Sequence, residues 1–127
     1  MGKDTDRDIL EKITDLISAC KTLIETINDN KYVPHIVTQP VDYTGSVGDT
    51  ASFTVLANNV KEYQWQYRVY NQQTWNDSDD VTASTNSFSV KIKTTPNTYN
   101  IRYRCKITGL DNSIIYTNEV KAVQPEI

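Results

Sequence analysis

The spacing of apolar residues changes once along the chain, and this change constrains the fold more than any other feature. Before residue 31, apolar residues recur every three or four positions, which is the period of one face of an α-helix. After residue 31, apolar and polar residues alternate, which is the period of strands with one buried face. The sequence therefore predicts a mainly β protein: an N-terminal amphipathic α-helix in residues 1–31 and an antiparallel β-sandwich in residues 32–127.

The N-terminal segment has a heptad pattern with an additional apolar row on one flank. The seam positions are Ile9, Ile13, Leu16, Cys20, Leu23 and Ile27, and the flanking positions are Leu10, Ile17 and Ile24. An isolated helix would leave this stripe in water, so we expect it to pack on a second copy, on another protein or back on the sandwich. The additional row is wider than a two-stranded seam can bury, which favours a homo-oligomer and, among these, a trimer.

The second part of the chain contains several runs that alternate clearly. They lie in residues 51–58, 63–70, 88–92 and 101–107, and residues 33–39 and 115–123 are expected to supply the first and last strands. Polar turns such as Thr44-Gly45-Ser46 separate the runs, as in an antiparallel sandwich. Pro34 and Pro40 favour an edge position for the first strand, because an edge strand tolerates a missing amide donor.

These runs also carry the residues of a known family. The stretches are Gly48-Asp49-Thr50-Ala51-Ser52-Phe53, Tyr63-Gln64-Trp65-Gln66, Trp75, Tyr103-Arg104-Cys105 and Thr117-Asn118. Together they resemble the bacterial immunoglobulin-like (Ig-like) domain, a family common in bacterial surface proteins and in tailed-phage virion proteins. The resemblance covers about residues 34–123 and implies an Ig-like sandwich.

The resemblance also implies roles for core residues. Trp65 is expected to pack between the two sheets, with Phe53 in the same core. The hydroxyl of Tyr103 is expected to bond back to the backbone as a tyrosine corner. Cys105 matches the second cysteine of the family, but Val55 stands where its partner would be. We therefore expect no inter-sheet disulfide and a buried Cys105 that behaves as a small apolar residue.

Composition excludes several classes of function. The formal net charge of −3 argues against nucleic-acid binding, which needs a basic surface. No stretch approaches the roughly 20 apolar residues that span a bilayer, and the first residues are too acidic for a signal peptide, so we expect no membrane insertion. The single histidine, His35, has no nucleophile near it in the sequence, and no glycine loop for phosphate is present. We expect no enzymatic activity and no cofactor.

Two polar clusters are candidate binding sites. Asp77, Asp79 and Asp80 could offer oxygen ligands to calcium, but they lack the EF-hand spacing, which favours a solvated acidic loop. The second cluster alternates with apolar residues on two runs expected to be neighbouring strands: Gln64, Gln66, Arg68, Arg102, Arg104 and Lys106. Because arginine forks fit carboxylate and phosphate groups, this patch is a candidate site for anionic surface carbohydrate. The alternative is a set of ordinary solubilising residues.

A helix with an apolar stripe followed by one sandwich is typical of an attachment stalk that carries a display domain. Taken with the resemblance, this organisation implies a phage structural protein located in the virion and assembled in the host cytoplasm. A capsid decoration or head-fibre protein, attached to the major capsid protein or another virion protein, is favoured. Tail, baseplate or neck attachment is an alternative, as is a bacterial surface binding module with a heterotypic docking helix. Host-surface carbohydrate would be a weak partner that gains avidity from many copies.

Overall fold

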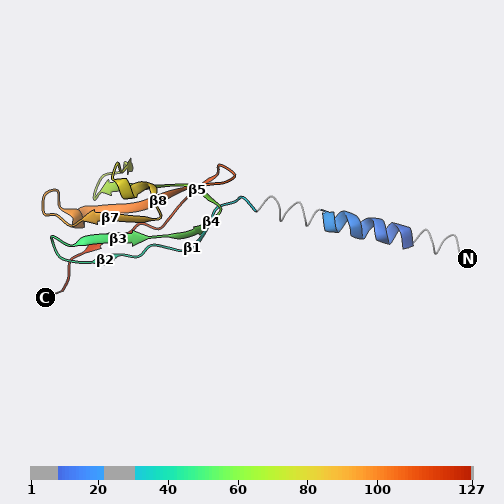
Figure 1. The fold of residues 1–127 in the computed structure, drawn as a ribbon, viewed down its shortest axis with the longest axis horizontal. Helices are drawn as coiled ribbons and strands as arrows, with labels where there is room; N and C mark the ends of the chain where they lie inside the picture. Colours follow the sequence, from blue (N-terminus) through green and yellow to red (C-terminus); the bar gives the residue numbers. More distant parts are fainter. Residues whose placement is uncertain (1–8, 22–30, 127) are drawn as a thin grey trace, which may run out of the picture. The chain divides into compact units, whose positions relative to one another are not determined.

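The computed structural model describes residues 9–21 and 31–126, and Figure 1 draws its fold. Residues 9–21 form a continuous stretch of α-helix. The chain divides into two compact units, Met1–Tyr32 and Val33–Ile127. Within the described part of the chain, no helix combines the length and the apolar character that crossing a membrane requires.

Ten strands and two short 3-10 helices follow one another along residues 35–123. The strands are β1 (His35–Thr38), β2 (Tyr43–Thr44), β3 (Thr50–Thr54), β4 (Leu56–Asn58), β5 (Val60–Val69), β6 (Asn76–Asp77), β7 (Ser87–Lys91), β8 (Ile101–Gly109), β9 (Ile114–Tyr116) and β10 (Ala122–Val123), and the 3-10 helices are η1 (Val81–Ser84) and η2 (Thr98–Asn100). The alternating runs of the sequence coincide with β3, β4, β5, β7 and β8, which confirms the predicted strand periodicity.

Apart from the parallel pair of β2 with β10, the strands form two layers, whose ribbons Figure 1 draws. In one layer β1 pairs with β4 and β3 pairs with β7, both antiparallel. Only Val55 separates β3 from β4, and its N–H donates to the carbonyl of Asn86 at 3.0 Å, so the two pairs continue one another. The other layer has the order β6-β5-β8-β9. The chain is therefore mainly β, with an Ig-like antiparallel sandwich after an N-terminal helix, as predicted.

Two predicted strands differ in extent from the observed ones. The first, expected over residues 33–39, is reduced to β1, and Pro34 is buried against Gly109, where an added Cβ would collide with the proline ring. The last, expected over residues 115–123, is divided into β9 and β10. It is interrupted at Thr117, whose side-chain hydroxyl accepts a hydrogen bond from the N–H of Cys105 at 2.8 Å.

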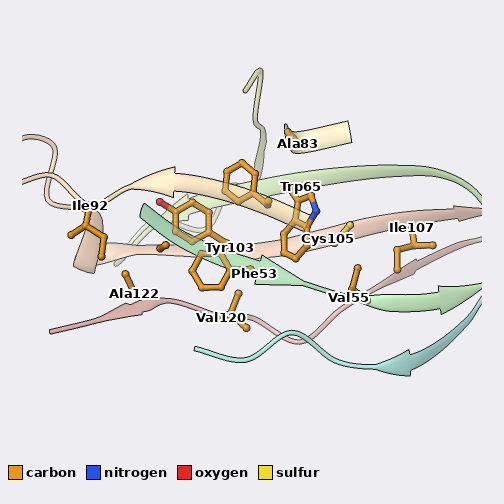
Figure 2. Close-up of a cluster of buried hydrophobic side chains, with 12 residues drawn as sticks. Phe53, Val55, Trp65, Ala83, Ile92, Tyr103, Cys105, Ile107, Val120 and Ala122 are labelled. Carbon is orange, nitrogen blue, oxygen red and sulfur yellow. The ribbon is translucent and has the colours of Figure 1, made fainter. Parts of the chain in front are cut away.

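The core contains the residues that the sequence predicted. Trp65, Val55 and Cys105 are completely buried, and Phe53 is buried with them. Figure 2 shows these side chains in one cluster between the layers. The indole N–H of Trp65 donates to the carbonyl of Thr85 at 2.8 Å, so the largest core side chain leaves no polar atom unsatisfied. Cys105 is a free, buried thiol, as expected.

The tyrosine-corner prediction for Tyr103 is wrong. Among the described residues, the hydroxyl of Tyr103 forms no hydrogen bond, and its ring instead packs 5.4 Å from the rings of Phe53 and Phe88, measured between centroids. A different tyrosine makes the long-range bond to the backbone: the hydroxyl of Tyr99 donates to the carbonyl of Gly45 at 2.7 Å. The reason is that Tyr99 lies in η2, before β8 begins, whereas Tyr103 is already an inward-facing position of the strand.

The outer edge of β7 is covered by threonine side chains. β7 pairs with β3 through one edge. On the other edge, the hydroxyl of Thr82 accepts a hydrogen bond from the N–H of Ser89 at 3.0 Å, and that of Thr85 accepts one from the N–H of Ser87 at 3.2 Å. Open strand edges are templates for pairing with other chains, so these hydroxyls protect the edge of this layer.

Candidate functional site

The outer face of the β5–β8 pair brings the predicted polar patch together. The ladder aligns Gln64 with Lys106, Gln66 with Arg104 and Arg68 with Arg102. The inward positions between them include Trp65 and Cys105, which are buried. Because side chains alternate between the faces of a strand, all six polar residues share one face, and the predicted juxtaposition is confirmed.

Arg104 lies against two aromatic rings on this face. Its guanidinium carbon is 4.3 Å from the ring centroid of Trp75 and 4.0 Å from that of Tyr116. Its Nε donates to the side-chain oxygen of Gln66 at 2.9 Å, and the amide of Gln66 donates to Asp77 at 2.8 Å. These contacts hold the guanidinium plane in one orientation, and cation–π attraction adds to the hydrogen bonds.

The two other arginines also have partners inside the domain. Arg68 forms an ion pair with Glu119 at 2.7 Å and donates to the carbonyl of Gln72 at 3.0 Å. Arg102 donates to the carbonyl of Tyr99 at 3.1 Å, and its guanidinium lies 5.2 Å from the ring centroid of Tyr70. The charge of this face is therefore largely engaged by the domain's own side chains and carbonyls.

The remaining two members of the patch differ from each other. The amide of Gln64 donates to the carbonyls of Trp65 and Ser78, each at 2.9 Å, so its donor end is used internally. Within the described part of the chain, the ammonium of Lys106 has no hydrogen-bond or ion-pair partner. Lys106 is thus the member of the patch whose charge is most available to a ligand.

Sequence reasoning missed the aromatic half of this face. Tyr116 lies in β9, next to Lys106 in the ladder, and 46% of its side chain is exposed. Trp75 belonged to the family pattern, but no spacing rule placed it over Arg104. The alternation of Ile115 with Tyr116 was the available signal, since it orients Tyr116 to the outer face. The arrangement offers exposed ring surface beside fixed cations, which suits stacking with a planar or sugar ligand.

The acidic cluster does not form a metal site. Among residues 9–21 and 31–126, no three His, Cys, Asp or Glu residues lie close enough together to hold an ion. Asp77 accepts from Gln66, and Asp80 caps η1 by accepting from the N–H and the hydroxyl of Thr82 at 2.9 and 2.7 Å. These bonds lower the pKa of Asp80. Asp77 and Asp80 have local structural partners, and the calcium alternative for Asp77, Asp79 and Asp80 is not supported.

The helix presents an apolar stripe. In residues 9–21 the predicted side chains are between 49% and 65% exposed: Ile9, Leu10, Ile13, Leu16 and Ile17. Cys20 is a free and exposed thiol on the same stripe. The remaining predicted positions, Leu23, Ile24 and Ile27, lie outside the described residues.

No family model and no curated protein matches the sequence. The structure of the D1 domain of Duf (Kirre) is 15% identical with a TM-score of 0.46, and the match covers 74% of this chain and 100% of that chain. A chimeric titin Z1Z2-Z1Z2 tandem is 14% identical with a TM-score of 0.47, and the match covers 75% of this chain and 51% of the tandem. The Ig-like assignment therefore rests on the strand order, register and core described above.

Proposed function

We propose that the chain is a non-enzymatic structural protein of a phage virion that attaches through its N-terminal helix and displays its Ig-like domain. A capsid decoration or head-fibre protein is the favoured form. The observation that carries the proposal is the apolar stripe: five Leu and Ile side chains in residues 9–17, each about half exposed or more. Fully burying one such side chain contributes roughly 1.5–3 kcal/mol, so a partner surface that covers the stripe gains enough to drive association.

The Ig-like domain suits display because its own core is closed. Its aromatic and aliphatic core side chains are buried within residues 51–122. The outer face of β5 and β8 is the surface that the domain offers to a partner, with Tyr116 and Lys106 as its available groups. Weak contact of this face with host-surface carbohydrate would be strengthened by the many copies on one particle.

Mass spectrometry of particles purified from a phage that encodes the chain tests the virion assignment. We expect the chain in washed particles, at a constant ratio to the major capsid protein. Leu16→Lys places a charge in the apolar stripe and should remove the chain from particles. Asp15→Lys places the same side chain on the opposite helix face and should leave it bound. Particles that lack the wild-type chain would exclude this function.

A second candidate is a bacterial surface module whose helix docks on a different protein. The same stripe would support it, because a heterotypic partner can cover the apolar side chains equally well. The two candidates differ in the behaviour of the purified chain: self-assembly is expected for a fibre or decoration stalk, and a monomer for a heterotypic docking arm.

A further inference from the structure

A cavity of about 420 Å³ opens beside the β3–β7 pair and the start of β8. Its volume lies within the range of small-molecule pockets, about 300–1,000 Å³. Tyr103, Val90 and Ile101 form part of its wall, and Lys91 and Lys93 also line it. None of these residues belongs to the outer face of β5 and β8 that carries Arg68, Arg102 and Arg104, which is called the arginine face below.

One residue that lines this cavity has a hydrogen-bonding group without a partner. Tyr103 is only 3% exposed, yet its hydroxyl forms no hydrogen bond with any described residue. Figure 2 shows the hydroxyl pointing away from Trp65, towards the end of the sandwich where Ile92 lies. No side-chain polar atom of the described residues is both fully buried and unpaired, so this hydroxyl must keep some access to solvent, which the cavity provides. Burial raises the pKa of Tyr103 to about 12, so the group is a neutral donor over the physiological range.

The charges at the cavity favour an anion. Lys91 and Lys93 are both exposed residues of the lining, and each carries an ammonium group. Asp80 is the opposing carboxylate, but it is already held by the N–H and hydroxyl of Thr82. The net charge of these three groups is +1, with the cations free to move toward a ligand.

We propose that this cavity binds the carboxylate of an acidic sugar, with the Tyr103 hydroxyl donating to the ligand and Lys91 and Lys93 pairing with its charge. The apolar wall of Val90, Ile101 and the Tyr103 ring fits the C–H face of a sugar ring. An oxyanion without a sugar ring, such as phosphate, would fill only part of the cavity and would leave this apolar wall in contact with water. An acidic sugar therefore fits the cavity better than a small anion does. The proposal gives the display domain a carbohydrate site distinct from the arginine face.

Titration of the full chain with glucuronic acid, glucose and inorganic phosphate, followed by amide NMR shifts, tests the proposal. We expect saturable shifts with glucuronic acid at the residues that line the cavity, no saturation with glucose, and weaker binding of phosphate. Tyr103→Phe keeps the ring contacts of the core and removes only the hydroxyl, so it should weaken glucuronic acid binding about tenfold. The Lys91→Met/Lys93→Met double variant changes exposed residues alone and should abolish saturation.

Lys61→Met is the matched control, because Lys61 is an exposed lysine that does not line the cavity, so its substitution should leave the titration unchanged. The proposal is overturned by an absence of saturable shifts, by shifts centred on Arg104 and Lys106, or by phosphate binding as tightly as glucuronic acid. Assembly through the helix is measured separately by solution mass, so failure of the carbohydrate site and failure of the proposed virion function give different results.

Discussion

At the scale of single residues, the arginines of the outer face are held by rings and carbonyls of the domain. Arg104 has the most complete set of contacts, with the rings of Trp75 and Tyr116 beside its guanidinium group and Gln66 at its Nε. These contacts depend on the guanidinium group, because a lysine ammonium has no plane to pack against an aromatic ring. Arg104 therefore contributes to the stability of the sheet in addition to carrying a charge.

Replacing Arg104 by Lys tests this role. The substitution keeps the charge but loses the guanidinium plane and the Nε bond to Gln66, so the free energy of unfolding should fall by about 1–2 kcal/mol. Urea denaturation of both proteins measures the difference. Lys106→Met, on the same strand face but without a partner, should change stability by less than about 0.5 kcal/mol. Equal effects of the two substitutions would show that these contacts contribute no stability.

Two buried residues make the fold sensitive to alkaline pH. Burial raises the pKa of Cys105 from 9.0 to about 12 and that of Tyr103 from 10.0 to about 12. The unfolded chain therefore loses these protons at a lower pH than the folded chain. Their contribution to stability is complete below about pH 9 and is lost progressively as the pH rises toward 12.

Cys105→Val, in a Cys20→Ser background that prevents disulfide exchange, isolates the contribution of the thiol. Valine cannot ionise, so the free energy of unfolding should fall less between about pH 8 and 10 in this variant than in its background protein. Denaturant titrations at several pH values give the comparison. Parallel pH profiles for the two proteins would mean that Cys105 does not titrate in the way described.

At the scale of elements, η1 takes the place beside β7 where another strand could otherwise pair. Thr82 in η1 accepts the Ser89 N–H at 3.0 Å and donates to Asp80 at 2.7 Å, so one hydroxyl joins the edge strand to the cap of the 3-10 helix. The 3-10 helix η1 thus covers the open edge of β7 without adding a strand to the layer.

Thr82→Val removes this hydroxyl while it keeps the shape of the side chain. The Ser89 N–H loses its acceptor, so we expect a loss of about 1 kcal/mol in the free energy of unfolding and faster aggregation at high protein concentration. Thr82→Ser keeps the hydroxyl and should resemble the wild-type protein in both respects. Denaturation and light scattering over time provide the two readouts. Wild-type behaviour of Thr82→Val would mean that the edge is protected by other groups.

The elements also show how far the sequence determines the fold. The register of β5 and β8 was predictable, because a slip of one residue would expose Trp65 and Cys105 and bury the polar patch. Residues 70–86 have no alternation, so neither η1 nor the position of Trp75 over Arg104 could be predicted. The choice between Tyr99 and Tyr103 as the residue that bonds the backbone also depends on where β8 begins, and no pattern in the sequence marks that boundary.

At the scale of the whole molecule, the chain combines a helix with an exposed apolar stripe and a sandwich with a closed core. The proposed function assigns attachment to the first and display to the second. The heptad spacing of Ile9, Ile13 and Leu16, together with the additional row of Leu10 and Ile17, favours three copies over two. Three copies of one sandwich would also triple the number of weak binding faces on one stalk.

The most direct test of this account is the solution mass of the full chain, measured by light scattering after size exclusion. The account predicts a mass of three times 14.5 kDa for the wild-type chain and for Asp15→Lys. It predicts a folded monomer for Leu16→Lys and for a truncation that starts at Val33. A monomeric wild-type chain at the same concentration would contradict self-assembly through the helix, and it would direct the search to a different protein that covers the apolar stripe.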